Sequence, residues 1–122
     1  MRAKSLWQSF KYAGQGIAYS FVTQRNFRIH CLAAALLIFS LFVLDFSPWE
    51  ILFLLSAAFA VLIAELINTA IEKAIDLYTS AYHPLAKTAK NCAAAAVLMA
   101  ALYAVLVALL IFAPRLMDLL RR

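Results

Sequence analysis

The sequence ILFLLSAAFAVLIAELINTAIE occupies residues 51–72 and decides the fold. Its first part is almost entirely apolar, whereas its last part carries Glu65 and Glu72 with an asparagine and a threonine between them. A helix needs about 20 residues to cross the hydrocarbon of a bilayer. A helix that enters near Trp49 is therefore still at membrane depth at Glu65 and leaves near Ala70.

Two further apolar stretches flank this one, from Ile29 to Leu44 and from Ala93 to Ala113. Together they predict an all-α integral membrane protein with three transmembrane helices. Pro48 and Pro84 each suit the first turn of a helix, and Pro114 with the basic tail is expected to end the last span. The expected spans run over about residues 28–45, 49–70 and 93–113.

The segment before the first span mixes aromatic with polar side chains over about residues 5–24, which is typical of a helix in the membrane interface. Gly14 and Gly16 weaken this pattern in the middle. We expect an N-terminal amphipathic surface helix, and a frayed extension is the alternative. Residues 1–122 then form a single membrane-embedded domain.

The composition excludes an ordinary soluble domain. Hydrophobic residues make up 66% of the chain and charged residues only 14%, and the net charge is +5. A basic balance in a chain this apolar favours anionic lipid headgroups and phosphorylated substrates as partners. Nucleic acid is not expected as a partner.

The distribution of basic residues predicts the topology. The loop between the first two spans has Asp45 and Glu50 and no basic residue. The positive-inside rule therefore places the N-terminus and the second connection in the cytoplasm, in a multi-pass protein of the cell (inner) membrane. Arg115, Arg121 and Arg122 fall on the outer side, against the rule. The basic residues on the cytoplasmic side are Arg2, Lys4, Lys11, Arg25, Arg28, Lys73, Lys87 and Lys90.

A polar stripe carries the chemistry. Its members are Glu65, Asn68, Thr69, Glu72 and Asp76. Their spacing places them on one face of a helix. Ionisable side chains at membrane depth are costly, and two stacked carboxylates need a cation, a proton or a basic partner. A divalent metal or a metal-bound nucleotide would satisfy them. A polar contact between helices is the alternative, and for Asp76 structural capping or ion pairing is equally expected.

A second polar cluster follows the loop after that helix. Lys87 and Lys90 lie in the first turns after Pro84, beside exposed backbone N–H groups that suit an anion. Lysines that extend to the membrane surface are the alternative reading. Tyr82 and His83 are candidates for contacting a nucleotide or for anchoring at the interface.

His30 lies about one turn into the first span, where a histidine is unusual. It is expected to line the site, and a hydrogen-bonded core histidine is the alternative. Arg25 and Arg28 flank the start of the span and are expected to anchor it at the interface or to contact phosphate. There is no glycine-rich phosphate loop of a known type, so any phosphate chemistry here uses another design.

Several of these stretches together resemble the prokaryotic diacylglycerol kinase family. ELINTAIEKAID at residues 65–76 is the specific part, and the support comes from NFRIH at 26–30, YHPLAKTAK at 82–90 and YAGQG at 12–16. The likeness extends in the same order from about Phe10 to Ala113. The Arg-Ile-His and His-Pro-Leu-Ala-Lys forms are more similar to the undecaprenol-kinase branch.

The resemblance implies a homotrimeric lipid kinase with active sites between protomers at the cytoplasmic interface, with ATP as co-substrate and Mg²⁺ as cofactor. It implies that Glu65 is the general base for the lipid hydroxyl, that Glu72 holds the metal and that Asn68 supports the site. Thr69 and His30 are expected to face the lipid substrate. The residues expected at ATP are Tyr12, Gln24, Glu72, Ala81, Tyr82, His83, Lys90 and Asn91.

Two positions depart from the family pattern. Gln24 stands where the family has a second metal-binding glutamate, and Asn91 stands where it has an aspartate. Each change keeps the shape and removes a negative charge, so Gln24 attracts a cation less strongly than a carboxylate does. The alternative function is therefore a weakened or inactive member that binds lipid or nucleotide as an oligomer. A small proton-coupled transporter is a third hypothesis, since such proteins carry one buried acid.

Overall fold

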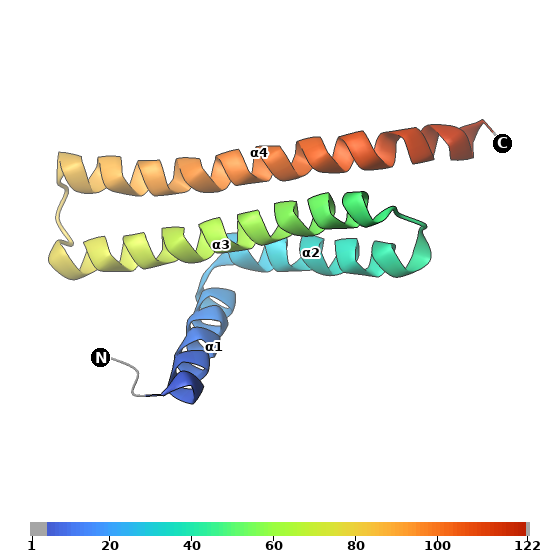
Figure 1. Cartoon of the computed structure of the whole chain (residues 1–122). Coiled ribbons are helices and arrows are strands. Elements are labelled where there is room, and N and C mark those ends of the chain that lie inside the picture. The colour runs from blue at the N-terminus through green and yellow to red at the C-terminus, as the bar shows by residue number, and fades with distance from the viewer. Residues whose placement is uncertain (1–4, 122) are drawn as a thin grey trace.

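The computed structural model describes residues 5–121 and consists of four helices, with no strand in that range. Three of the helices are long and apolar enough to cross a membrane, so the predicted all-α membrane fold is confirmed. Three of the basic residues used for the topology, Arg2, Lys4 and Arg122, lie outside the described range. The helices are α1 (Leu6–Thr23), α2 (Arg25–Val43), α3 (Pro48–Tyr78) and α4 (Pro84–Leu120) (Figure 1).

Both predicted proline starts are confirmed, and each has a side-chain cap. Ser47 caps α3 by accepting the backbone N–H of Glu50, whose carboxylate accepts the N–H of Ser47 in return. His83 caps α4, because its Nδ1 accepts the backbone N–H of Leu85 at 3.2 Å. These bonds satisfy N–H groups that a helix start leaves without partners, and so they fix where α3 and α4 begin.

The break between α1 and α2 falls at Gln24, where the sequence has neither proline nor glycine. Arg28 explains it, because its Nη1 donates to the main-chain oxygens of Phe21 and Val22 at 3.2 and 2.9 Å. A cation at these last carbonyls also complements the helix dipole of α1. Figure 1 shows α1 leaving the other helices at a steep angle, as a helix in the membrane interface would.

Helix α3 is the centre of the structure and packs against α1, α2 and α4. Its buried residues recur every three or four positions and therefore form one face. The core on this face includes Leu54, Ala57 and Val107, with Leu37 and Phe112 packed around it. The buried residues of α3 are Leu54, Ala57, Val61, Glu65 and Thr69. The glutamate and the threonine thus continue the apolar face that packs the bundle.

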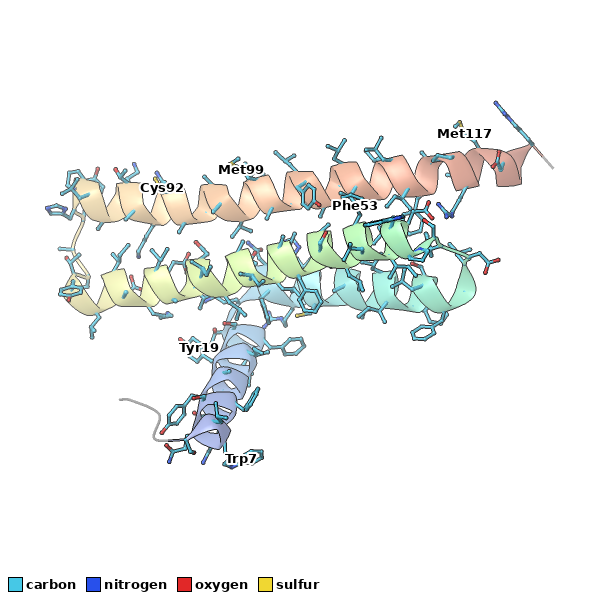
Figure 2. The ribbon with its side chains drawn as sticks, viewed as in Figure 1. Trp7, Tyr19, Phe53, Cys92, Met99 and Met117 are labelled. Carbon is cyan, nitrogen blue, oxygen red and sulfur yellow. The ribbon has the colours of Figure 1, made fainter. Side chains whose placement is uncertain are left out.

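Much of the outer surface is apolar. Phe42 is 85% exposed and Leu110 69%, and Figure 2 shows Met99 and Met117 on the side of α4 that faces away from α3. Apolar surface on this scale suits lipid tails or further helices rather than water. The outer surface of the bundle is thus suited to contact lipid tails, and the interior residues of α3 lie only one helix layer away from them.

The expectation that Pro114 ends the last helix is wrong, since α4 continues to Leu120. Proline removes one backbone hydrogen bond and crowds the preceding turn, but it does not always terminate a helix. The next residue holds this turn in place: Arg115 donates to the main-chain oxygens of Ile111 and Asp45 and to both carboxylate oxygens of Glu50, all at 2.8 to 3.0 Å. We call this group the Arg115 cluster.

Replacing Arg115 with leucine is expected to lower the unfolding temperature of the purified protein in detergent by several degrees. The change removes the donors that join α4 to the start of α3, and Glu50 loses its two-point partner. The unfolding temperature of Arg115→Lys should lie between those of the native protein and Arg115→Leu. Lysine keeps the positive charge, but an ammonium cannot reproduce the paired hydrogen bonds of a guanidinium. Arg121→Leu, at the residue that follows the end of the same helix, is the control. Equal unfolding temperatures for the two leucine variants would contradict the structural role of the cluster.

Candidate active site

The polar stripe of α3 runs from the interior of the bundle to its surface. Glu65 is 3% exposed and Thr69 5%, Asn68 and Glu72 are half-buried, and Asp76 is exposed. The residues follow one another along a helix that is about 46 Å long at 1.5 Å per residue. That length exceeds the roughly 30 Å of bilayer hydrocarbon. The exposed end therefore fits the prediction that the helix extends beyond the membrane.

Glu65 is a buried carboxylate with an unsatisfied oxygen. Its Oε1 has no hydrogen-bond partner among the described residues. The nearest basic atom is Nε2 of His30 on α2, at 3.5 Å. The predicted site residue His30 is thus brought to Glu65 by the packing of two helices. Thr69, by contrast, donates its hydroxyl to the main-chain oxygen of Glu65 at 2.9 Å, so its proton is already used within α3.

Asn68 and Glu72 form a second pair one turn further along. Nδ2 of Asn68 donates to Oε1 of Glu72 at 3.3 Å, which orients the carboxylate. The amide oxygen of Asn68 is buried and has no partner in the described structure. Carboxylate and amide oxygens are the ligands that a hard cation such as Mg²⁺ prefers. The two side chains therefore offer oxygen atoms of the kind that a magnesium ion would need.

A cavity of about 290 Å³ lies where α3 ends and α4 begins. It gathers most of the residues predicted at ATP, and these are Ala81, Tyr82, His83, Lys90 and Asn91. Asp76 and Lys87 add two further charged side chains to its lining. Lys90 donates to Oδ1 of Asp76 at 2.6 Å, so the ion-pair reading of Asp76 is confirmed. Lys87 lies 6.0 Å above the ring of Tyr82.

Tyr12 and Gln24 do not line this cavity. Tyr12 is 44% exposed on α1, and Gln24 occupies the joint between α1 and α2. Glu72, the third predicted ATP residue outside this cavity, lies one turn before Asp76 on α3. Over residues 5–121, no group of three or more His, Cys, Asp or Glu side chains is placed to hold a metal ion.

Two features of the site were not anticipated from the sequence. One is the contact between His30 and Glu65, which belong to different helices and are 35 positions apart. The other is Lys73, which lies 4.0 Å from Asp76 and lines a groove between α1 and α3. Its position directly after Glu72 was the available signal. It adds a third lysine to the charged end of α3.

Comparison with known proteins assigns the chain. The sequence pattern of the prokaryotic diacylglycerol kinases matches residues 11–112. The chain belongs to this family. A diacylglycerol kinase of Synechocystis sp. is 43% identical over 97% of this chain and 68% of its own length. The undecaprenol kinase of Bacillus subtilis is 44% identical over 90% of this chain and 89% of its own.

A more distant relative, the diacylglycerol kinase of Escherichia coli, is 33% identical over 78% of each chain. Membership in the diacylglycerol kinase family confirms the prediction of a membrane-bound lipid kinase. The two relatives at 43% and 44% identity carry different lipid names, so similarity alone leaves the choice of lipid alcohol open. The roles of the individual site residues stay predictions.

Proposed function

We propose that this family member transfers the γ-phosphoryl group of ATP to the hydroxyl of a membrane lipid alcohol, undecaprenol or diacylglycerol, at the cytoplasmic surface of the membrane. The observation that carries the proposal is Glu65. It is a carboxylate buried on the packing face of a membrane helix, and its Oε1 has no hydrogen-bond partner among the described residues. An ionisable side chain at membrane depth lowers stability, and it is therefore a candidate for a functional role.

The order of groups along α3 supports the assignment. Glu72 lies two turns beyond Glu65, about 10 Å along the axis, and Asp76 lies one turn further, beside the cavity. A lipid hydroxyl would meet Glu65 at membrane depth. A nucleotide would occupy the polar cavity beyond the bilayer. The reacting groups therefore approach one another along a single helix.

In the proposed reaction the oxygen of the lipid hydroxyl attacks the γ-phosphorus of ATP while Glu65 accepts the hydroxyl proton. The bond between the γ-phosphorus and the oxygen that leaves with ADP breaks. Glu72, supported by Asn68, would hold Mg²⁺, which neutralises phosphate charge when bound. Lys90 is placed to meet phosphate oxygens once it leaves Asp76. Phosphoryl transfer depends mainly on such positioning and charge neutralisation.

The Arg115 cluster also bears on orientation. The proposed topology has the N-terminus in the cytoplasm and places Arg115 on the outer side of the membrane. Arg115 therefore counts against that topology. In the structure it is paired with Glu50 at 2.8 Å. The positive-inside rule counts lysines and arginines rather than net charge, so this pairing leaves Arg115 as an exception, but the first helix and the short loops usually dominate orientation. We therefore retain a cytoplasmic N-terminus.

We further propose a homotrimer in which neighbouring chains complete the site. Tyr12 and Gln24 do not line the cavity of their own chain, which fits a contribution to another copy. The exposed apolar surface and the alanines along α3 and α4 would permit close helix contact. Chemical cross-linking in detergent, resolved by mass, tests the trimer directly.

The decisive experiment is transfer of label from γ-³²P-ATP to lipid by the purified protein in mixed micelles, with undecaprenol and diacylglycerol in parallel. We expect magnesium-dependent labelling of at least one of them, and the ratio of the two kcat/KM values names the preferred lipid. Absence of labelling with either lipid, at saturating ATP and magnesium, would contradict the proposal. Proton-linked uptake in vesicles without ATP turnover would instead support the transporter hypothesis.

The weakened-member alternative rests on Gln24 and Asn91. If these amides limit the enzyme, the double variant Gln24→Glu with Asn91→Asp should need about tenfold less magnesium for half-maximal rate, a typical change for an altered metal environment. Gln15→Glu on α1 is the control for the change at position 24, because it makes the same substitution outside the joint. Brisk turnover by the native chain would exclude the inactive reading, and an unchanged magnesium requirement would show that neither amide limits the rate.

A further inference from the structure

His30 is the feature of the site that the assigned reaction leaves without a role. It is the residue of α2 that approaches the buried carboxylate on α3, with Nε2 3.5 Å from Oε1 of Glu65. The side chain of Glu65 is only 4% exposed, and that of His30 is 27% exposed. The approached oxygen is the one that has no hydrogen-bond partner in residues 5–121.

We infer that His30 is a positioning residue for Glu65, an inference that rests on the proposed function. Its Nε2 lies 3.5 Å from Oε1, and a proton on Nε2 donated to that oxygen would fix the rotation of the carboxylate. Oε2 is then left to accept the proton of the lipid hydroxyl. A base held in one orientation does not have to be ordered again during each turnover.

The electrostatic environment of Glu65 supports a positioning role for His30. The charged or chargeable groups that act on it are His30 from α2 and Glu72 from its own helix. Glu72 has the same sign and repels. A buried carboxylate needs a hydrogen-bond donor or a cation to offset its lost hydration, and the imidazole is the group placed to provide one. Hydrogen bonds of catalytic groups are often long without substrate and shorten in the complex.

Packing between α2 and α3 sets the position of the imidazole. Phe27, one turn before His30, is 2% exposed and fixes this end of α2. On the other side, His30 borders an apolar groove of about 270 Å³ between α2, α3 and α4, lined largely by alanines such as Ala34 and Ala101. His30 therefore borders both the buried carboxylate and the groove. Its ring carbons can contact a lipid chain while its Nε2 holds Glu65.

The alternative is that His30 serves the lipid alone, as first predicted from the sequence, and kinetics separate the two roles. A lipid contact would act on the KM for lipid. A positioning residue would act on kcat, because the hydroxyl still binds but the base is misdirected.

The test compares His30→Leu, His30→Gln, Glu65→Gln and the double variant His30→Leu with Glu65→Gln, each assayed for kcat and for both KM values. For His30→Leu we expect kcat to fall roughly 10- to 100-fold, the usual cost of a small misplacement, with little change in the KM for lipid. His30→Gln keeps an N–H donor and should recover most of the rate. It also serves as the readout if the leucine variant folds poorly.

In the double variant His30→Leu should cause no further loss, because the group through which it acts is already gone. Loss of the same factor in both backgrounds would overturn the inference, as would a change confined to the KM for lipid or no effect of His30→Leu. Activity of Glu65→Gln at the native rate would instead overturn the proposed function, and the inference with it.

Discussion

Glu65→Gln is expected to reduce lipid phosphorylation by at least roughly 100-fold, the lower range of the contribution that general bases make. Glutamine has the same size and keeps a carbonyl oxygen, but it cannot take up the proton that leaves the lipid hydroxyl. The KM for ATP should stay close to the native value, because the nucleotide cavity lies some three turns further along α3. Steady-state assays with labelled ATP, varied against each substrate, measure both constants.

The matched control is Glu50→Gln, the same chemical change on the same helix about 22 Å away at 1.5 Å per residue. It disturbs the Arg115 cluster and should lower the unfolding temperature while leaving kcat largely intact. Full activity of Glu65→Gln would contradict the role of the base. An equal loss of kcat in both variants would show that the effect comes from destabilisation of α3.

The second large effect is expected for Glu72→Gln, through magnesium. The variant removes the negative charge that Asn68 orients by its 3.3 Å hydrogen bond. The magnesium concentration for half-maximal rate should rise by at least about tenfold, because even residues outside the ligand shell of a metal typically have effects of this size. Chelation of magnesium should abolish transfer in the native protein.

Titration of the rate with MgCl₂ at fixed ATP gives this result, and Asp76→Asn is the comparison. Asp76 pairs with Lys90 and not with Asn68, so its loss should change the KM for ATP more than the magnesium requirement. If Glu72→Gln and the native protein need the same magnesium concentration, Glu72 is not the ligand. The cation must then be held by the phosphates and by other side chains.

The starts of the helices could be predicted from the sequence, because the signals are local. Pro48 and Pro84 open α3 and α4 as expected, and both caps come from adjacent residues. The end of α4 could not be predicted. Whether the helix continues past Pro114 depends on Arg115, whose partners at Asp45 and Glu50 are far away in the sequence.

The site divides in the same way. The helical period alone places Glu65, Asn68 and Glu72 on one face, and a single loop brings Tyr82 and Lys90 to the end of that helix. Burial of that face could not be read from the period, since it depends on which neighbours cover it. The same holds for the ion pair of Asp76 with Lys90, which was left open beside capping and chemistry.

What the sequence by itself determined is the membrane-spanning fold, the polar stripe on one helix and, through its motifs, the kinase family, because periodicity and motifs are properties of neighbouring residues. What only the tertiary structure decided is the contact of His30 with Glu65, the joint held by Arg28 and the Arg115 cluster. Each of these depends on distances between helices. Such distances are set by packing, which no single stretch of the chain encodes.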